Sequence, residues 1–453
     1  MIATLLDYYR CGELSSSFEM RGLISGPAGF FTWDEDITCY GHCTSGVPGS
    51  KAGDVLYDIS SDVVQEDSRI FLPFNPDEVA LNLRRERYSS HFNEPVSPSQ
   101  ALVRRIYYVL RPLMAVPIRK HLQRINLRDW NKIPFPRWPV DSTIDKLHRR
   151  LLALAMKNAG VETIPFIWFW PDDYRACIII THDVEETEGR DFCGQLMDID
   201  ASFGFYGSYQ VVPEERYTVP KSYLAQINER GCEVNVHDLN HDGRLYAEYE
   251  EFLRRARRIN EYGREFNAVG FRSGALYRNA DWFGALHFQY DLSIPNVGHM
   301  DPQRGGCCTI MPYFIGDLVE LPLTCTQDYT QFNMFHDYST GLWERQTGII
   351  MANNGLITIL VHPDYIIDSR PQTAYKNLLR YLAELRDREK LWSPLPRDVA
   401  KWWRQRSQMK LVRNDSGWEI AGEGKERARV AYAKLDGNSV TYELAAPVVG
   451  AAP

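Results

Sequence analysis

The feature that most constrains this sequence is a repeated alternation of short apolar runs with amphipathic segments, which starts at residue 176. Most of the runs are separated by stretches of helical periodicity, such as KSYLAQINERG and RLYAEYEEFLRRARRINEYG. Strand–helix–strand repeats of this kind form parallel strands joined by right-handed crossovers. The pattern therefore predicts an α/β fold, and seven runs fit an incomplete seven-stranded (β/α) barrel better than an open sheet. The runs are 176–181, 207–212, 232–237, 267–272, 291–294, 318–323 and 357–362.

Parallel barrels place their chemistry at one rim, which is formed by the C-terminal ends of the strands. Acids and histidines stand at these ends in the present sequence, so we expect them to gather at that rim. The polar ends are Thr181-His182-Asp183-Val184-Glu185, His237-Asp238-Leu239-Asn240-His241, Arg272-Ser273-Gly274, Glu320 in the sixth run, and His362-Pro363-Asp364.

The segments on either side of the repeat differ from it in pattern. The first part is rich in Gly, Ser and Asp with short apolar pieces, which indicates an irregular β-containing module. Helices are expected over 77–88, 98–128 and 142–160, the last with Ser142 as N-cap and Gly160 as C-cap. The tail alternates apolar and polar residues and predicts a small β appendage. The expected parts are 1–75 (N-terminal module), 76–165 (helical extension), 166–395 (barrel) and 396–453 (appendage).

The expected helical segment 98–128 carries only basic charges. Its periodicity is interrupted by Pro112 and Pro117. A surface that touches a membrane is one interpretation, and a solvated helical face is the one we favour. The basic residues are Arg104, Arg105, Arg111, Arg119, Lys120, Arg124 and Arg128.

Composition and charge exclude several classes of protein. Lys and Arg number 51 against 59 Asp and Glu, a net charge of −8, which argues against a nucleic-acid-binding protein. No apolar run is long enough for a transmembrane helix. The start, MIATLLDYYR, lacks the basic region of a secretory signal, so a cytoplasmic location is expected. The pattern indicates no oligomeric state.

Nine cysteines, an odd number on a long chain, indicate free thiols in a reducing compartment. Cys11, Cys39, His42 and Cys43 are close enough in sequence to suggest a zinc site, but no second pair of ligands follows, so buried thiols are favoured. Two neighbouring tryptophans at 402 and 403 could stack on sugars; we favour the interpretation that they anchor a helix.

His237 and His241 are spaced four residues apart directly after the third run. Roughly 0.3 such pairs are expected by chance in a chain of this composition, and two polar loop histidines are the alternative. Their position is informative, because a helical turn after the strand would place both imidazoles on one side. Two imidazoles and one carboxylate, with open positions for water, form a hydrolytic metal site.

Asp183 and Glu185 could supply the carboxylate of that site. In an extended chain their side chains point to the same face, while Val184 points away. One acid could then bind the metal while the other stays free as a general base. A solvated acidic loop is the alternative, since Glu186 and Glu188 follow.

His362 and Arg272 complete the set of candidates. His362 ends the apolar run GLITILVHP. Such a histidine is usually buried, but beside a metal site it becomes a candidate proton donor. Arg272 could orient or pair with a carboxylate, with a surface ion pair as the alternative.

This combination resembles the NodB-homology polysaccharide deacetylases, carbohydrate esterase family 4. The motifs occur in the family's order between residue 176 and about 365, less than half of the chain. The family's Thr-Phe-Asp-Asp corresponds to 181–184, its His-(Ser/Thr)-x-x-His to 237–241, its Arg before a Pro to 272–274, and its Leu-x-His to 360–362. The pieces WPDDYRACIIITHDVE and VELPLTCTQD are similar to a divergent bacterial branch with a THDV(D/E) first motif.

The resemblance implies a role for each candidate. Asp183 would be the catalytic base, held by Arg272; His362 would be the general acid; and His237 and His241 would be metal ligands. The usual family has a metal-binding Asp where this chain has Val184. Branches with an Asp-x-Asp first motif use the second acid, which assigns the third ligand to Glu185. The Pro of the third motif is also missing, because Gly274 stands there.

The function expected from this set is metal-dependent removal of an acyl group, N-acetyl above all, from an amino sugar of a glycan. The cofactor expected from the ligand types is Zn²⁺, with Co²⁺, Ni²⁺ or Fe²⁺ as alternatives. Two other functions stay open. One is a hydrolase on the same barrel that cleaves the C–N bond of a small cyclic amide. The other is a non-catalytic glycan-binding scaffold in polysaccharide assembly.

Overall fold

The structure is a computed structural model that describes residues 2–12, 14, 16–24, 26–89, 127, 129–415 and 417–445. The chain divides into two compact units, each built from segments that are far apart in the sequence. The first unit contains Met1–Asn82, Ser142–Ala176 and Lys401–Pro453, and the second contains Leu83–Asp141 and Cys177–Ala400. The division into four parts that we expect from the sequence stays a prediction.

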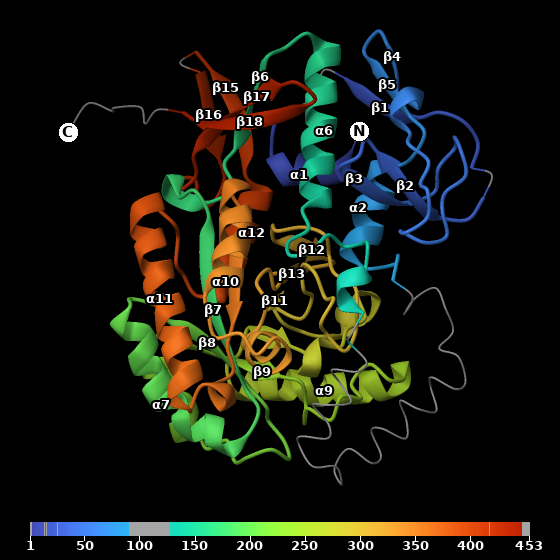
Figure 1. Cartoon of the computed structure of the whole chain (residues 1–453). Coiled ribbons are helices and arrows are strands. Elements are labelled where there is room, and N and C mark those ends of the chain that lie inside the picture. Colours follow the sequence, from blue (N-terminus) through green and yellow to red (C-terminus); the bar gives the residue numbers. More distant parts are fainter. Residues whose placement is uncertain are drawn as a thin grey trace. The chain divides into compact units, whose positions relative to one another are not determined.

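The second unit is built on a sheet of eight strands, of which seven are parallel (Figure 1). Each apolar run of the repeat forms one parallel strand, so the predicted fold class is confirmed. The eighth strand, β12, is antiparallel and lies at one edge. In spatial order the strands are β12 (Tyr313–Ile315), β13 (Leu318–Glu320), β11 (Tyr290–Asp291), β10 (Gly270–Arg272), β9 (Glu233–His237), β8 (Gly207–Val211), β7 (Cys177–Val184) and β14 (Leu356–Leu360).

The two ends of this sheet approach each other without forming a regular ladder. The chain that follows β13 runs beside β14, where the Thr358 hydroxyl donates to the Pro322 carbonyl at 2.7 Å. The Thr358 amide donates to the Thr324 hydroxyl at 2.9 Å, and the Cys325 amide donates to the Thr358 carbonyl at 3.3 Å. The barrel is therefore incomplete, and these bonds bring the segment after β13 close to the end of β14.

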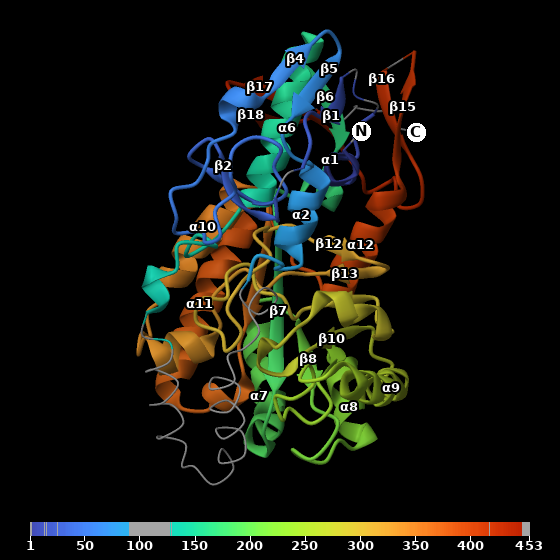
Figure 2. The ribbon, with the colours of Figure 1, turned by 90° about the vertical axis from the view of Figure 1, so that its right-hand side faces the viewer.

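Five long helices accompany the strands of this unit (Figures 1 and 2). Two of them, α7 and α11, lie side by side: the Tyr375 hydroxyl donates to Asp200 at 2.6 Å, and Arg386 donates to the Gly204 carbonyl at 3.0 Å. Asp200 also lies 2.9 Å from Nε2 of the buried His182, so this histidine belongs to the packing between helix and sheet. The helices are α7 (Thr187–Ser202), α8 (Lys221–Glu229), α9 (Tyr249–Glu265), α10 (Gly341–Ala352) and α11 (Ser369–Glu389).

In the first unit, helix α6 (Thr143–Ala159) packs against strands from both ends of the chain (Figure 1). Its buried positions, such as Ile144, Leu147, Leu151 and Ala155, recur every three or four residues and form one apolar face. The strands are β1 (Ser17–Met20), β5 (Arg69–Leu72) and β4 (Val64–Glu66) in one sheet; the hairpin β2 (Gly29–Trp33) and β3 (Ile37–Gly41); β18 (Ser439–Leu444), β17 (Val430–Asp436) and β6 (Thr163–Ile167) in another sheet; and the hairpin β15 (Lys410–Asn414) and β16 (Gly417–Ala421). The helix α1 (Ala3–Tyr9) also belongs to this unit.

The helical predictions are confirmed only in part. Gly160 has φ 64° and ends α6 as expected, but the Ser142 hydroxyl makes no capping hydrogen bond. The predicted helix 77–88 ends early, because α2 spans Pro76–Arg84. The predicted basic segment 98–128 lies outside the described residues except for residue 127. The last helix, α12, spans Pro396–Gln408. Among the described helices, none is long and apolar enough to cross a membrane.

Most cysteines and both tryptophans are buried, as the favoured interpretations predict: eight of the nine thiols are buried and Cys11 is partly exposed. All nine cysteines are free thiols. Nδ1 of His42 lies 2.6 Å from Glu78 instead of a thiol, and burial raises the pKa of Cys11 to about 11. Trp402 and Trp403 are buried, and the Trp402 indole donates to the Phe169 carbonyl at 2.8 Å, so this residue anchors its helix.

Candidate metal centre

The structure brings all six sequence-predicted site residues together at the C-terminal ends of the parallel strands. Asp183 lies near the end of β7, and Glu185 is the first residue after this strand. His237 ends β9, and Arg272 ends β10. His241 follows β9 by four residues and His362 follows β14 by two. The parallel arrangement alone explains why residues up to 179 positions apart in sequence meet here.

Asp183 is held at one carboxylate oxygen and faces the site with the other. Arg272 donates to its Oδ1 at 2.8 Å and to the Thr181 hydroxyl at 3.0 Å. Its Oδ2 lies 3.7 Å from Nε2 of His237 and 3.9 Å from Nε2 of His362. Both Arg272 and Asp183 are buried, so the ion pair fixes this carboxylate in an environment that screens charge poorly.

Glu185 faces the same space as Asp183, as the alternation along the extended chain predicts. Its Oε1 lies 3.0 Å from Nε2 of His241, 3.9 Å from Nε2 of His237 and 3.6 Å from Nε2 of His362. Val184 is fully buried and points away. The replacement of the usual family's second Asp by a valine therefore removes no carboxylate from the site, because Glu185 reaches it from the next position.

An irregular loop connects His237, at the end of β9, with His241, so the helical turn that we expected is wrong. Asp238 and His241 have φ of 56° and 54°, which a helix does not contain. The Asp238 amide donates to the Arg272 carbonyl at 2.9 Å, and this bond holds the loop on the neighbouring strand end. The rings of His237 and His241 still come together, with centroids 5.0 Å apart.

A hydrogen bond at Nδ1 determines that Nε2 is the ring nitrogen of His237 that faces the candidate site. Nδ1 lies 3.0 Å from the Arg272 carbonyl and therefore carries the proton. Nε2 faces the candidate site and is buried without a well-aligned hydrogen-bond partner among the described residues. Nε2 of His241 is likewise buried without a well-aligned partner among them. Arg216 donates to the His241 carbonyl at 2.9 Å, which fixes its backbone.

The donor set fits a divalent metal ion. Glu185, His237 and His241 each offer one ligand atom, and these atoms all lie within 4.8 Å of one another. Nε2 of His237 is buried, lacks an aligned partner among the described residues and faces two carboxylates, so a bound cation would satisfy the nitrogen and both acids together. The contact of 3.4 Å between Arg216 Nη2 and Nδ1 of His241 is long, and a metal on Nε2 would weaken it because Nδ1 would then carry the proton.

His362 has a carboxylate partner that we did not expect. Nδ1 of His362 lies 2.7 Å from Oδ1 of Asp328, and its backbone amide donates to Oδ2 at 2.8 Å. Asp364, which is nearer to His362 in sequence, instead accepts hydrogen bonds from the amide of Glu185 at 3.2 Å and from the amide of Gly189 at 3.0 Å, in the first turn of α7. His362 is therefore oriented by Asp328, with its Nε2 toward Asp183 and Glu185.

The surroundings shift the pKa values of the two acids and of His362 in opposite directions. Burial alone would raise the pKa of Asp183 and Glu185, but the neighbouring Arg272 and histidines lower the pKa of Asp183 and hold that of Glu185 well below its usual value. Burial alone would lower the pKa of His362, but Asp328, with Glu185 and Asp183, raises it to about 10. At neutral pH the site thus combines two ionised carboxylates with a protonated His362.

The missing proline of the third motif has a steric reason. A Cβ atom at Gly274 would lie 2.5 Å from Oδ2 of Asp238 and 2.8 Å from Cδ2 of His241. The loop that carries His241 therefore passes directly over this position, and any side chain would displace it. Gly274 is a requirement of the present loop.

A second pair of acids lies behind Arg272. Asp291 and Glu320 are neighbours in the register of β11 and β13, and both are fully buried. Burial raises the pKa of Asp291 to about 6 and that of Glu320 well above its usual value. Two carboxyl groups this close in a buried site share a proton. Asp291 accepts from the Ser293 amide at 2.8 Å, so the pair shapes the loop that follows β11.

That loop supports Arg272 from behind. The Nε of Arg272 donates to the Leu292 carbonyl at 3.0 Å, and the Ser273 amide donates to the Ser293 hydroxyl at 2.9 Å. Sequence reasoning noted Glu320 at a strand end without giving it a role, and it missed Asp291 and Asp328. The available signal for Asp291 and Glu320 was an acidic residue at the end of a parallel strand, and Asp328, eight residues after β13, has no such signal.

Comparisons with known proteins give similarity over about half of the chain. No family model matches the sequence, and no curated protein sequence matches it. A protein from Mycobacterium smegmatis described as a polysaccharide deacetylase has 19% identity and a TM-score of 0.43, over 52% of this chain and 93% of that one. The Puue allantoinase has 12% identity and a TM-score of 0.41, over 52% of this chain and 92% of that one. The peptidoglycan deacetylase PdaC from Bacillus subtilis has 13% identity and a TM-score of 0.34, over 51% of this chain and 94% of that one.

Proposed function

We propose that this protein is a metal-dependent hydrolase that removes an acyl group, N-acetyl above all, from an amino sugar of a glycan. The observation that carries the proposal is the convergence of two imidazole nitrogens and one carboxylate at the end of the barrel. The ligand atoms of Glu185, His237 and His241 lie within 4.8 Å of one another, and Nε2 of both histidines is buried without a well-aligned hydrogen-bond partner among the described residues.

These three side chains would hold the metal, and the remaining groups would move protons. A divalent cation bound there supplies Lewis-acid chemistry, which polarises an acyl carbonyl and acidifies a water molecule. Two imidazoles and one carboxylate favour Zn²⁺, and Co²⁺, Ni²⁺ or Fe²⁺ suit the same ligands. The motif resemblance to polysaccharide deacetylases supports a glycan as the substrate.

Asp183 is placed to act as the general base. Arg272 occupies its Oδ1 and leaves Oδ2 facing the site. Its lowered pKa keeps it ionised at neutral pH, so it can accept the proton of an attacking water molecule. Arg272 acts through Asp183, as a positioning residue that sets which oxygen reacts.

His362 is placed to act as the general acid. An amine anion is too basic to leave unaided, so cleavage of an amide needs a donor that stays protonated near neutral pH. The hydrogen bond of Nδ1 to Asp328 directs the proton on Nε2 toward the space between Asp183 and Glu185. Oδ2 of Asp183 and Nε2 of His362 lie 3.9 Å apart, so the base and the acid face the same space.

The test is a joint measurement of metal content and acetate release. Purified protein should contain one divalent ion per chain and release acetate from N-acetylated oligosaccharides. His237→Ala should lose both, because a three-ligand site loses an inner-shell contact. His287→Ala is the control for the loss of an imidazole, since this exposed histidine lies in the same unit and belongs to neither the candidate site nor the pocket of this unit. Full metal occupancy in His237→Ala would overturn the ligand assignment.

The same assay separates the rival functions. Hydrolysis of a small cyclic amide without acetate release would favour the second hydrolase. Purified protein that binds glycans, holds no metal and releases nothing would favour the scaffold. The complete set of acids and histidines at the strand ends supports a catalyst over a scaffold, because a binding surface has no need for a paired base and acid.

A further inference from the structure

Two buried acids lie behind Arg272, at the ends of β11 and β13. Asp291 and Glu320 are neighbours in the register of these strands, and neither side chain is exposed to solvent. Their carboxyl groups form a hydrogen bond with each other. Two ionised carboxylates cannot form such a bond, because neither has a proton to donate. The pair therefore holds one proton, and the surrounding contacts differ between the two acids.

The contacts favour Asp291 as the anion and Glu320 as the acid that carries the proton. Oδ1 of Asp291 accepts from the Ser293 amide at 2.8 Å, and its Oδ2 accepts from the Ser293 hydroxyl at 2.9 Å. Oε1 of Glu320 accepts from the Ile294 amide at 3.0 Å, while no donor among the described residues reaches its buried Oε2. Hydrogen bonds to both oxygens stabilise the charged form of a carboxyl group. Oε2 of Glu320 is the oxygen that is free to carry a proton toward Asp291.

The segment after β11 connects this pair to the arginine of the candidate site. Nε of Arg272 donates to the Leu292 carbonyl at 3.0 Å. The Ser273 amide donates to the Ser293 hydroxyl at 2.9 Å, and this hydroxyl gives its own proton to Asp291. A continuous chain of hydrogen bonds thus leads from Asp291 to the end of the strand that carries Arg272.

Arg272 also interacts with the pair through its charge. Its Nη1 donates to Oδ1 of Asp183 at 2.8 Å, whereas its Nη2 is buried without a partner among the described residues. The charge of Arg272 lowers the pKa of Asp291 and of Glu320, against the effect of burial. If both acids were ionised, their two charges would compete with the single charge of Asp183 for this guanidinium. One proton on the pair leaves one negative charge on either side of Arg272.

We propose that the Asp291–Glu320 pair, with its proton on Glu320, is the positioning unit that keeps Arg272 on Asp183. The inference rests on the proposed function for the role of Asp183 as the general base. The pair sets the place of the guanidinium, and the guanidinium determines which oxygen of Asp183 faces the site. Neither acid belongs to the group that could hold a metal ion, so the pair should control the rate of the reaction and leave metal binding unchanged.

The first test compares two substitutions that remove one carboxyl group each. Glu320→Gln should keep kcat, because its amide oxygen can accept from Ile294 and its N–H can donate to Asp291 as the carboxyl proton does. Asp291→Asn should lower kcat about 10²-fold with KM and metal content unchanged, because its N–H₂ group meets the Ser293 hydroxyl, a donor. Equal losses of kcat in the two variants would overturn the assignment of the proton to Glu320.

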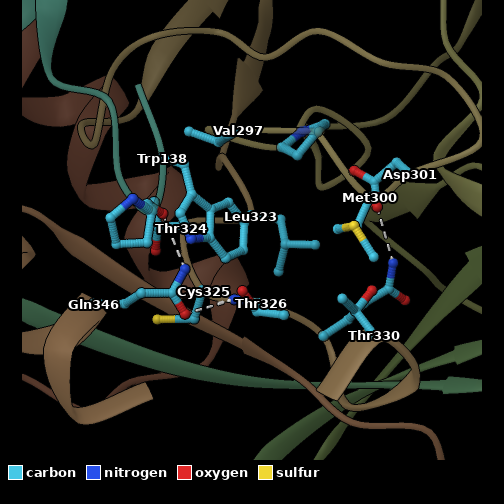
Figure 3. A pocket seen from close by; sticks show the side chains of 13 residues that line it. Trp138, Val297, Met300, Asp301, Leu323, Thr324, Cys325, Thr326, Thr330 and Gln346 are labelled. Atoms are coloured by element: carbon cyan, nitrogen blue, oxygen red, sulfur yellow. Dashed lines mark hydrogen bonds between the residues drawn. The ribbon is translucent and has the colours of Figure 1, made fainter. Parts of the chain in front are cut away.

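Asp301→Asn is the matched control for the loss of a buried negative charge. Asp301 belongs to the same unit and is buried, and it lines a small pocket beside Trp138 (Figure 3). Its Oδ1 accepts from Gln327 at 3.1 Å, a contact that asparagine can keep. This variant should have the kcat of the wild type. A loss as large as that of Asp291→Asn would mean that any buried acid of this unit has the same effect, and the pair would have no special role.

A double-mutant cycle decides whether the pair acts through the base. In the Asp183→Asn background, Asp291→Asn should cause no further loss of kcat, because Arg272 then has no carboxylate to position. Equal losses in both backgrounds would show that Asp291 only supports the fold. If Asp291→Asn fails to fold, Ser293→Ala breaks the same chain of hydrogen bonds at its middle and should show the same dependence on Asp183.

Two spectroscopic measurements separate this inference from the proposed function, since neither needs a substrate. A protonated carboxyl group has an infrared C=O band that a carboxylate lacks, and at about pH 8 exposed acids are ionised. The wild type should show this band there, and Glu320→Gln should lose it. The Nε–H signal of Arg272 in ¹⁵N NMR, identified by its absence in Arg272→Lys, should exchange slowly in the wild type and in Glu320→Gln, and faster in Asp291→Asn.

These outcomes distinguish the two failures. The expected band and NMR signals in a protein that releases no acetate would remove the proposed function and leave the pair as the unit that holds Arg272. Acetate release by a wild type whose infrared band is the same as that of Glu320→Gln would overturn the protonated pair alone. An Arg272 signal that is unchanged in Asp291→Asn would overturn the positioning role.

Discussion

At the scale of single residues, two carboxylates separated by one valine have different surroundings. Asp183 is bound to Arg272 and Glu185 approaches two imidazoles. Asp183→Asn should therefore keep the metal and lower the rate by about 10²–10⁴, the usual contribution of a positioned base. Glu185→Gln should instead weaken the affinity for metal. Metal titration and initial rates on one N-acetylated substrate measure the two effects.

The reversed pattern would exchange the two roles. If Asp183→Asn loses the metal while Glu185→Gln keeps it, then Asp183 is the ligand and Glu185 the base. Each substitution keeps the volume of the side chain, so a loss of folding is a smaller concern than for alanine. Circular dichroism of both variants is the control for a shared structural defect.

The pKa of His362 gives a prediction about pH. Asp328 is the largest favourable influence that raises this pKa to about 10. The protonated imidazole is the active form of an acid, so kcat/KM should fall as the pH rises through this pKa. Asp328→Asn removes the charge and should move the basic limb to lower pH by about 1–3 units. A basic limb at the same pH in the wild type and Asp328→Asn would contradict the assignment.

The same pair contributes to stability in a defined pH range. The pKa of His362 in the folded protein lies above the unfolded value of about 6.5. The contribution of this pair to the free energy of unfolding is therefore complete below about pH 6.5 and is lost as the pH rises through about 10.

His362→Gln serves as a further control for the acid role. An activated ester has a leaving group that needs little protonation, so this variant should harm amide cleavage far more than ester cleavage.

At the scale of elements, the loop between His237 and His241 depends on the neighbouring strand end. Gly274→Ala would place a methyl group 2.5 Å from Oδ2 of Asp238 and 2.8 Å from the ring of His241. The loop must then move, and His241 moves with it. We expect metal affinity to fall about 10–100-fold, similar to the loss of a group that orients a ligand, with little change in melting temperature at saturating metal. Isothermal titration with Zn²⁺ measures the affinity.

Gly284→Ala is the matched control for that substitution, because nothing lies within 4 Å of a Cβ atom at Gly284. It belongs to the short 3₁₀ segment Ala280–Ala285 of the same unit. Unchanged metal affinity in both variants would mean that the loop adjusts without moving His241. If the affinity for metal also falls in Gly284→Ala, the effect would be a general one of added methyl groups.

The strands and the site were predictable from sequence to different degrees. The parallel strands follow from local apolar runs, so all seven were found. The antiparallel strand β12 was missed although a signal exists: Gly316 and Asp317 form a two-residue turn between Ile315 and Leu318, a typical hairpin. Strand β6 (Thr163–Ile167) was also missed, because the predicted boundary between the helical extension and the barrel falls inside it, whereas the strand pairs with β17.

The partner of His362 could not be found by the same means. Asp364 is near His362 in sequence, and a local argument selects it. Asp328 reaches His362 only because the segment after β13 closes the barrel beside β14. Contacts of this kind depend on the assembled fold and leave no periodic pattern in the sequence. The identities of the six candidate residues, by contrast, followed from strand ends and motif order.

At the scale of the whole molecule, the residues of the candidate metal centre all belong to one of the two units. The second unit contains every residue of the candidate centre and the pocket of Figure 3. The first contains the four-residue cysteine and histidine group and the buried tryptophans 402 and 403. Among the described residues, the group that could hold a metal ion lies only in the second unit. A metal should therefore affect the stability of one unit and leave the other unchanged.

Removal of the metal tests this division. A ligand that binds only the folded state stabilises it by about 4 kcal/mol at a concentration 1,000 times its Kd. Treatment with a chelator should thus lower hydrogen-exchange protection in β7, β9 and β14, whose ends carry the ligands and the acid. Protection in α6 and β17 should stay the same. His237→Ala should show the chelated pattern with or without Zn²⁺, and an equal gain in protection on adding Zn²⁺ to this variant would place the metal elsewhere.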